Sequence, residues 1–224
     1  MNLNANIKNT NKKIPDGFIV FISGVPSSGK TTISYELLKR INKFRIIEET
    51  DIIRDVLRGY YSTINNAITL DLNSNLDNFF IYDNKKVLSY EQCENQCLIM
   101  SQSIVNIVKR QQRRGIATII NGIHIVPEIL DKIIIENNLI YINLYINNKV
   151  SLYERLYNRD SQSFMLDYLD LIFETNNKLY NSIEKIKDKN SYLYNNIDVT
   201  NKSVKDVLIK ISNIIQKRIE CINN

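Results

Sequence analysis

The stretch "ISGVPSSGKTT", residues 22–32, constrains the fold of this chain more than any other. It directly follows the apolar, strand-like residues 18–22. A chain with only six glycines and three prolines places two glycines and one proline in this turn. An amphipathic helical pattern follows, with its apolar positions at Ile33, Leu37, Leu38 and Ile41. The order strand, glycine turn, helix predicts a loop whose backbone must approach a ligand closely.

This loop fits the pattern G-x-x-x-x-G-K-[ST] without a mismatch. Gly24 and Gly29 permit backbone angles that let successive amide N–H groups point inward around a phosphate. Lys30 would place its charge on the β- and γ-phosphates, and the Thr31 hydroxyl can bind Mg²⁺. We therefore expect ATP and Mg²⁺ as cofactors. The expected nucleotide-binding residues are Gly24, Val25, Pro26, Ser27, Ser28, Gly29, Lys30, Thr31 and Thr32.

Short β-branched runs alternate with longer helical patterns along the whole chain. The expected strands are residues 18–23, 45–49, 117–121, 140–146 and 192–197. The expected helices are residues 30–42, 51–58, 91–114, 127–136, 149–158, 164–186 and 204–218. This alternation predicts an α/β protein: a three-layer α/β/α P-loop NTPase fold with a mostly parallel five-stranded sheet and a helical lid or insertion.

The length of 224 residues suits one domain with a full hydrophobic core. We expect that domain at residues 17–219, between a polar N-terminal tail at 1–16 and a C-terminal tail at 220–224. Within it, the Asn- and aromatic-rich residues 60–90 are expected to cover the substrate, and residues 149–163 to form a lid.

Charge and cysteine content favour a cytoplasmic protein that binds small anions. The net charge is +5 and the pI is near 8.9, but the basic residues are dispersed, so nucleic acid is not a favoured partner. No apolar run reaches membrane-spanning length, and "MNLNANIKNTNKK" lacks a signal-peptide core. The odd set Cys93, Cys97 and Cys221 argues against a disulfide framework. Cys93 and Cys97 share a helix face; buried thiols are favoured there over half of a metal site.

The stretch "EETDIIRDVLR" places a carboxylate and two arginines after the second expected strand. Asp51 lies at the carboxyl end of that strand, where open α/β sheets bind ligands. Arg54 and Arg58 follow on one helix face. Asp51 could orient or deprotonate an acceptor hydroxyl while the arginines hold negative groups of the acceptor. The alternative is a helix-capping aspartate with surface arginines.

Two further stretches hold candidate site residues. In "YERLYNRD", Arg155 and Arg159 are four residues apart and could close over the phosphates; the alternative is a solvated helix paired with Glu154 and Asp160. In "TIINGIHIVPE", the sole histidine, His124, follows a strand that ends at the same sheet edge as the phosphate loop. That location favours a role in substrate binding, although a lone histidine is more often structural.

Four segments together resemble the kinase domain of archaeal 2-phosphoglycerate kinase and its relatives, from about residue 18 to residue 211. They are "GVPSSGKTT", "TDIIRDVLR", "IINGIHIVPEIL" and "YLDLIFETNNKLYNSI". The resemblance implies an adenylate-kinase-like P-loop fold in which ATP phosphorylates a hydroxyl of a small phosphorylated acid. It also implies that Lys30 and Thr31 serve ATP and Mg²⁺, while Asp51, Arg54 and His124 face the acceptor.

The chain departs from this family in two respects. The family typically has an acid where this chain has Asn121, and an amide cannot accept a proton at neutral pH. Asp51 is then the remaining candidate for the base. The archaeal enzymes also carry an N-terminal nucleotide-sensing region, which we do not expect in a chain whose first strand begins near residue 18.

The leading hypothesis is therefore a P-loop kinase that transfers the γ-phosphate of ATP to a hydroxyl of a small anionic metabolite. The expected catalytic residues are Lys30, Asp51, Arg155 and Arg159, and the expected acceptor-binding residues are Asp51, Arg54, Arg58 and His124. One alternative is a kinase of polynucleotide or tRNA-linked hydroxyls, whose binding would weaken steeply with salt. Another is a non-catalytic, ATP-binding regulatory module.

Replacing Lys30 by alanine should abolish turnover of ATP, because the charge that stabilises the β- and γ-phosphates is lost. Product formation from labelled ATP measures this directly. Turnover equal to that of the unaltered protein would show that the loop does not bind the reacting phosphates.

Overall fold

The computed structural model describes residues 14–67, 89–131, 138–187 and 193–223. Its centre is one sheet of five parallel strands in the order β2-β3-β1-β4-β5. The strands are β1 (Ile19–Ser23), β2 (Phe44–Glu49), β3 (Ala117–Asn121), β4 (Leu139–Tyr145) and β5 (Tyr194–Asp198).

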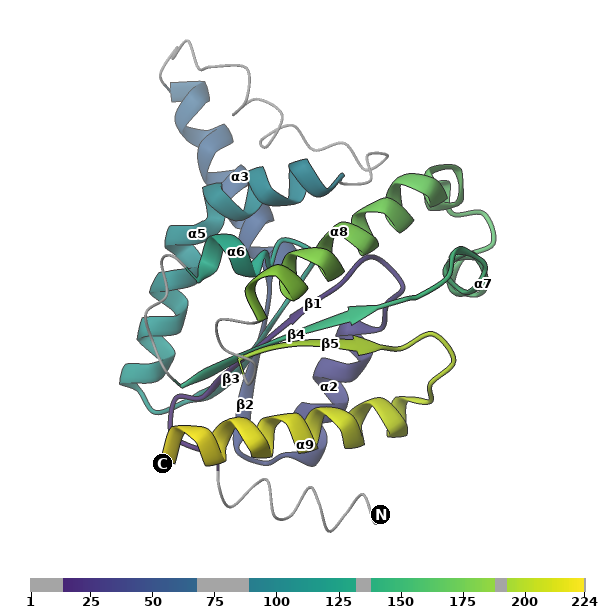
Figure 1. The fold of residues 1–224 in the computed structure, drawn as a ribbon. Coiled ribbons are helices and arrows are strands. Elements are labelled where there is room, and N and C mark those ends of the chain that lie inside the picture. The colour runs from purple at the N-terminus through teal and green to yellow at the C-terminus, as the bar shows by residue number, and fades with distance from the viewer. Residues whose placement is uncertain (1–13, 68–88, 132–137, 188–192, 224) are drawn as a thin grey trace.

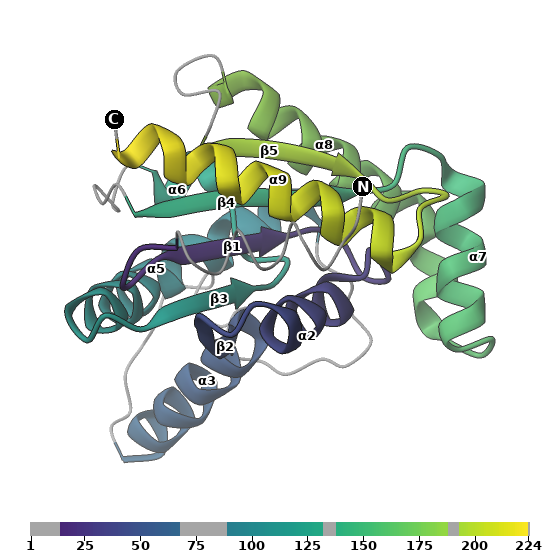
Figure 2. The ribbon, with the colours of Figure 1, turned by 90° about the horizontal axis from the view of Figure 1, so that it is seen from below.

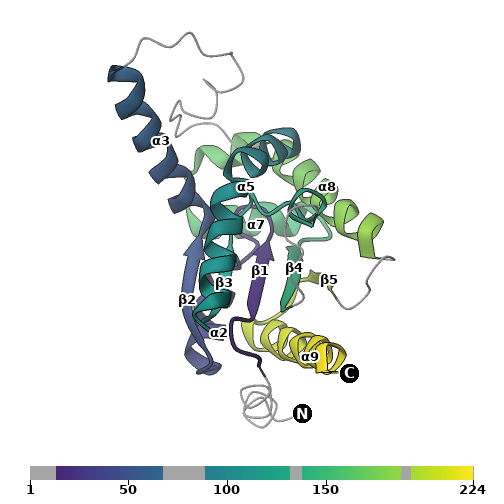
Figure 3. The same ribbon diagram turned by 90° about the vertical axis from the view of Figure 1, so that its left-hand side faces the viewer.

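Helices cover both faces of this sheet. They are α2 (Lys30–Arg40), α3 (Thr50–Ala67), α5 (Tyr90–Arg113), α6 (Pro127–Leu130), α7 (Lys149–Arg159), the 3₁₀ helix η1 (Phe164–Tyr168), α8 (Leu169–Lys187) and α9 (Val204–Asn223). Figures 1 and 3 show α2 and α9 on one face and α5 and α8 on the other. The view from below in Figure 2 shows α7 beyond the strand ends. The predicted three-layer α/β/α P-loop fold is confirmed.

The sheet forms the core because its central strands are apolar on both sides. Every residue of β1 and β3 is buried, as are six of the seven residues of β4. Continuous apolar strands suit a parallel sheet that helices cover on both faces. Phe21, Tyr141 and Tyr194 stack across β1, β4 and β5, with ring centroids 4.7 and 5.3 Å apart.

Parallel pairing brings three functional segments to one edge of the sheet. The phosphate loop follows β1, α3 follows β2, and the turn that carries His124 follows β3. These strands are neighbours in the order β2-β3-β1. Their carboxyl ends therefore meet beside β4, where the strand order reverses and where open α/β sheets bind ligands.

All five expected strands are present, with ends within two residues of those predicted. The helices differ more. The helix expected at 51–58 continues as α3 to Ala67, since one glycine, Gly59, weakens a helix without ending it. The helix expected at 164–186 divides into η1 and α8.

Three other expected segments differ from the observed elements or lie partly outside the described residues. The helix expected at 127–136 ends at Leu130 as α6, and residues 132–137 lie outside the described part. The expected C-terminal tail is wrong for residues 220–223, which belong to α9. Of the expected substrate-covering segment, residues 60–67 belong to α3, and 68–88 lie outside the described residues.

Cys93 and Cys97 are buried free thiols on α5, and burial raises the pKa of each to about 12. They match the favoured interpretation of two buried thiols. Among the described helices, none combines the length and the hydropathy that crossing a membrane requires.

Candidate active site

The loop from Gly24 to Lys30 has the backbone of a phosphate cradle. Gly24 and Gly29 have φ values of 144° and 94°, in the region that favours glycine. A Cβ atom on Gly24 would lie 2.5 Å from the Leu144 carbonyl oxygen and 2.6 Å from Ser28 Oγ, so no other residue fits there. Ser27 also adopts a left-handed conformation, with φ at 61°. Backbone strain of this kind is concentrated at functional sites.

Polar groups around the loop lack partners within the protein. The hydroxyls of Ser27 and Ser28 are buried without a hydrogen-bond partner in the described part of the chain. The N-terminus of α2 has no side-chain cap and no acidic residue in its first turn. Its amide donors and positive dipole end suit an anion. The residues present therefore fit the phosphates of a nucleotide.

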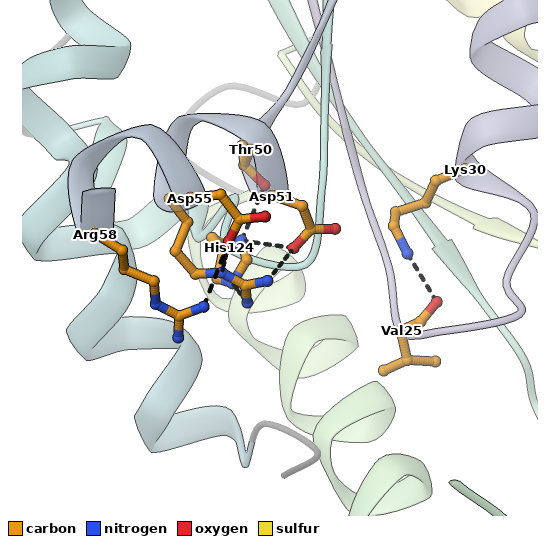
Figure 4. A network of polar contacts seen from close by, with 8 residues as sticks. Val25, Lys30, Thr50, Asp51, Asp55, Arg58 and His124 are labelled. Atoms are coloured by element: carbon orange, nitrogen blue, oxygen red, sulfur yellow. Dashed lines mark hydrogen bonds and ion pairs between the residues drawn. The ribbon is translucent and has the colours of Figure 1, made fainter. Parts of the chain in front are cut away.

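Lys30 lies against this loop and donates a hydrogen bond from Nζ to the Val25 carbonyl oxygen at 2.9 Å. Burial, with a smaller contribution from the positive charge of Arg159, lowers the pKa of Lys30 to about 8, against the opposing negative charges of Asp51 and Glu49. Figure 4 shows Lys30 and Asp51 on opposite sides of the site. Thr31 and Thr32 are exposed in the first turn of α2.

The first turns of α3 hold a cluster of two aspartates and two arginines. Arg54 Nη2 lies 3.2 Å from Asp51 Oδ1, and Arg54 Nε lies 3.7 Å from Asp55 Oδ1. Arg58 Nη1 lies 3.5 Å from the same Asp55 oxygen. The arginine side chains are 17% and 13% exposed, whereas both aspartates are more than half exposed. The structure thus brings together the predicted Asp51, Arg54 and Arg58, with the carboxylates on the solvent side.

His124 is fully buried behind this cluster, and both of its ring nitrogens have protein partners. Nε2 lies 3.2 Å from Arg54 Nη1, and Nδ1 lies 3.0 Å from Thr50 Oγ1. An arginine can only donate, so Nε2 accepts and Nδ1 carries the proton that it donates to Thr50. Burial and the nearby Arg54, Lys30 and Arg58 charges hold the pKa of His124 well below its ordinary value.

His124 therefore acts as a neutral support for Arg54. This corrects the expectation that His124 faces the acceptor, because a ring buried between Thr50 and Arg54 has no nitrogen left for a substrate. Gly122 makes the arrangement possible, since a Cβ atom there would lie 1.7 Å from Thr50 Oγ1.

The two predicted lid arginines take different places. Arg155 donates hydrogen bonds from Nη2 to the carbonyl oxygens of Val199 and Thr200, just beyond the edge strand β5. Its Nη2 is therefore engaged at the end of β5, and its role over the phosphates stays a prediction. Arg159 is exposed at the end of α7, and its positive charge contributes to the lowered pKa of Lys30. Its role beside the phosphates stays a prediction.

A ladder of polar side chains lies beneath the phosphate loop and was not predicted. Ser23 donates to Asn143 at 3.1 Å, Asn143 donates to Asn196 at 2.8 Å, and Asn196 donates to Glu184 on α8 at 2.8 Å. The three strand residues are paired in register across β1, β4 and β5. These hydrogen bonds link β1, which carries the loop, to β4, β5 and α8.

The strand order and the loop define the fold class of the protein: it is a P-loop NTPase fold, which solved kinases share. Among solved structures, it is similar to a gluconokinase from Sinorhizobium meliloti, with a TM-score of 0.50, 12% identity and coverage of 92% of this chain and 95% of that one. A thymidylate kinase from Candida albicans matches with a TM-score of 0.53, 13% identity and coverage of 92% and 94%.

Within that class, the sequence is similar to the 2-phosphoglycerate kinase of Pyrococcus horikoshii. The two are 28% identical over 220 residues, which cover 93% of this chain and 67% of the relative. The predicted resemblance is thereby confirmed. A scan against protein-family models finds no match.

Sequence reasoning missed Thr50 and the carboxylate of Glu49 as parts of this site. Thr50 stands directly before Asp51, but its role depends on contacts with Gly122 and His124, which lie in the turn after β3. The only sequence signal was the threonine of the T-D pair itself.

Replacing Gly122 by alanine should displace Thr50 and break its contact with His124. We expect a loss of about 2 kcal/mol in the free energy of unfolding, from backbone strain and the lost hydrogen bond. Urea denaturation measures this. The matched control is Gly59→Ala within α3, where an added Cβ meets nothing within 4 Å and should stabilise by about 0.5–1 kcal/mol. Equal stability of both variants would contradict the proposed contact.

The affinity of the protein for a nucleoside triphosphate should fall as the pH rises above the Lys30 pKa of about 8. The phosphates favour the charged ammonium, so binding to the neutral form requires uptake of a proton. Titration calorimetry should show roughly tenfold weaker binding at about pH 9 than at about pH 7. Lys30→Arg, whose guanidinium stays charged, should bind with a flat pH profile. A flat profile in the unaltered protein would show that Lys30 does not titrate there.

Proposed function

We propose that this protein transfers the γ-phosphoryl group of ATP to a hydroxyl of a small anionic metabolite, as a 2-phosphoglycerate kinase does. The observation that carries the proposal is the position of Asp51. Its carboxylate lies 3.2 Å from Arg54 on one side, and it is the largest source of negative charge acting on Lys30 on the other. A carboxylate beside a partly buried arginine and a lysine that would bind phosphate supports a role for Asp51 in orienting an alcohol.

The donor side of the reaction would use the loop and the start of α2. The backbone amides of the loop and Lys30 would bind the β- and γ-phosphates. The Thr31 hydroxyl, exposed in the first turn of α2, would hold Mg²⁺. The bound Mg²⁺ would neutralise part of the charge on the phosphate oxygens.

The acceptor side would use Arg54 and Arg58 to bind the negative group of the substrate. Arg54 Nε is buried without a hydrogen bond in the described part of the chain, so this guanidinium has a donor to offer. His124 and Thr50 fix its plane from behind. An anion that binds both arginines would leave its own hydroxyl beside Asp51.

In the transfer step, the acceptor oxygen forms a bond to the γ-phosphorus while the bond from that phosphorus to the β–γ bridging oxygen breaks. The hydroxyl proton passes to the Asp51 carboxylate, and ADP leaves with the bridging oxygen. Arg159, beyond the phosphate side of the site, would add positive charge to the transition state.

The acceptor class can be tested by screening for product from labelled ATP. The panel should contain 2-phosphoglycerate, other phosphorylated hydroxy acids, unphosphorylated hydroxy acids, nucleosides and polynucleotide ends. We expect transfer to a phosphorylated hydroxy acid and none to its unphosphorylated counterpart. Transfer only to polynucleotide ends would support the nucleic-acid alternative, and binding of ATP without any transfer would support the regulatory one.

We also propose that the protein acts in the cytoplasm. ATP is supplied there, and the reducing conditions would keep the buried Cys93 and Cys97 as free thiols.

Replacing Asp51 by asparagine should lower kcat by about 10²–10⁴-fold, because the amide cannot take the hydroxyl proton. Affinity for ATP should change little. Asp55→Asn is the matched control, since Asp55 is about equally exposed and also pairs with Arg54, but its charge acts less on Lys30 than that of Asp51 does. Its kcat should stay within about tenfold of that of the unaltered protein. Equal turnover by the Asp51 variant would remove this carboxylate from the mechanism.

A further inference from the structure

We propose that Glu49, at the carboxyl end of β2, is the carboxylate that binds the Mg²⁺ of Mg·ATP together with Thr31. The inference rests on the proposed function, since it assigns a residue to the metal that accompanies the nucleotide. It concerns a residue that the sequence patterns did not single out.

The sheet register places Glu49 in the row of residues that ends beneath the phosphate loop. Ile22 of β1 pairs with Asn121 of β3, and Asn121 pairs with Glu49 of β2. Side chains of paired residues in neighbouring strands point to the same face of a sheet. Asn121 Nδ2 donates to Ser34 Oγ on α2 at 3.0 Å, so that face is the one that α2 covers.

The neighbouring residue confirms this direction independently. Glu48 accepts a hydrogen bond from Gln111 of α5 at 3.5 Å, and α5 covers the opposite face (Figure 3). Because side chains alternate along a strand, Glu49 points toward α2. Ser34 lies one helical turn after Lys30 and Thr31, so Glu49 faces the part of α2 that begins at the phosphate site.

The negative charge of Glu49 acts on Lys30, and no close partner among the described residues neutralises it. Its carboxylate is one of the negative groups that act on Lys30. It is half-buried, and no hydrogen bond or ion pair of its carboxylate is found within residues 14–67, 89–131, 138–187 and 193–223. A partly desolvated carboxylate is stabilised by a cation.

The other candidates for a metal ligand are less suitable. P-loop enzymes hold Mg²⁺ with the loop hydroxyl and a strand-end acid. Asn121, next to β1, is neutral and donates to Ser34. Asp51 is paired with Arg54 at 3.2 Å. The described residues contain no group of three His, Cys, Asp or Glu side chains that could hold a cation alone, so the metal would share nucleotide oxygens with few protein ligands.

The test compares affinity for ATP in the presence of Mg²⁺ and in the presence of EDTA. For the unaltered protein we expect tighter binding with Mg²⁺. Glu49→Gln should lose this gain, by about tenfold or more, while its affinity in EDTA stays the same. Glu48→Gln is the matched control, because it removes the adjacent carboxylate on the opposite face and should bind like the unaltered protein.

A second variant tests the placement directly. Moving the carboxylate one strand inward, in the double variant Glu49→Gln with Asn121→Asp, should restore the gain that Mg²⁺ provides. Thermal unfolding without nucleotide verifies that each variant is folded. If Glu49→Gln fails to fold, Glu49→Asp, which keeps the charge, should retain a Mg²⁺-dependent gain.

The outcomes separate the two proposals. If the unaltered protein binds ATP more tightly with Mg²⁺ and Glu49→Gln does the same, the assignment of Glu49 is overturned while the proposed function stands. A double variant as weak as Glu49→Gln also counts against the assignment. Failure of the unaltered protein to bind ATP under either condition would instead overturn the proposed function.

Discussion

Parallel pairing of β2, β3 and β1 is the interaction on which the rest of the site depends. It aligns the ends of three strands, so that Ile22, Asn121 and Glu49 form one row. The phosphate loop, the first turn of α3 and the His124 turn all begin just beyond this row. A shift of one residue in any of these strands would turn its side chains to the opposite face and separate the groups.

The electrostatics of the site suit two anions. Burial lowers the pKa of Lys30, and Arg54 is held by a neutral histidine rather than by a buried carboxylate. The carboxylates that balance the arginines are solvent-exposed, where water screens their attraction. An incoming phosphate and an anionic acceptor can therefore compete for these cations. This follows from which charges the fold buries and which it leaves in water.

Much of the fold and half of the site could be predicted from the sequence because their signals are local. The glycines and lysine of the loop lie within eight residues, and the strands are continuous apolar runs. The contacts of His124 and Arg155 could not be predicted because they come from distant segments: Thr50 and Arg54 for the histidine, Val199 and Thr200 for the arginine. Spacing along a helix shows which residues share a face, but not what that face meets.

We propose that the loop binds the phosphates of ATP opposite the Asp51 carboxylate. A crystal structure with Mg²⁺ and a nonhydrolysable ATP analogue tests it most directly. We expect the loop amides to surround the β-phosphate, Lys30 Nζ to leave the Val25 carbonyl for the phosphate oxygens, and the γ-phosphate to face Asp51. A triphosphate bound outside the loop, or a γ-phosphate directed away from Asp51, would contradict it.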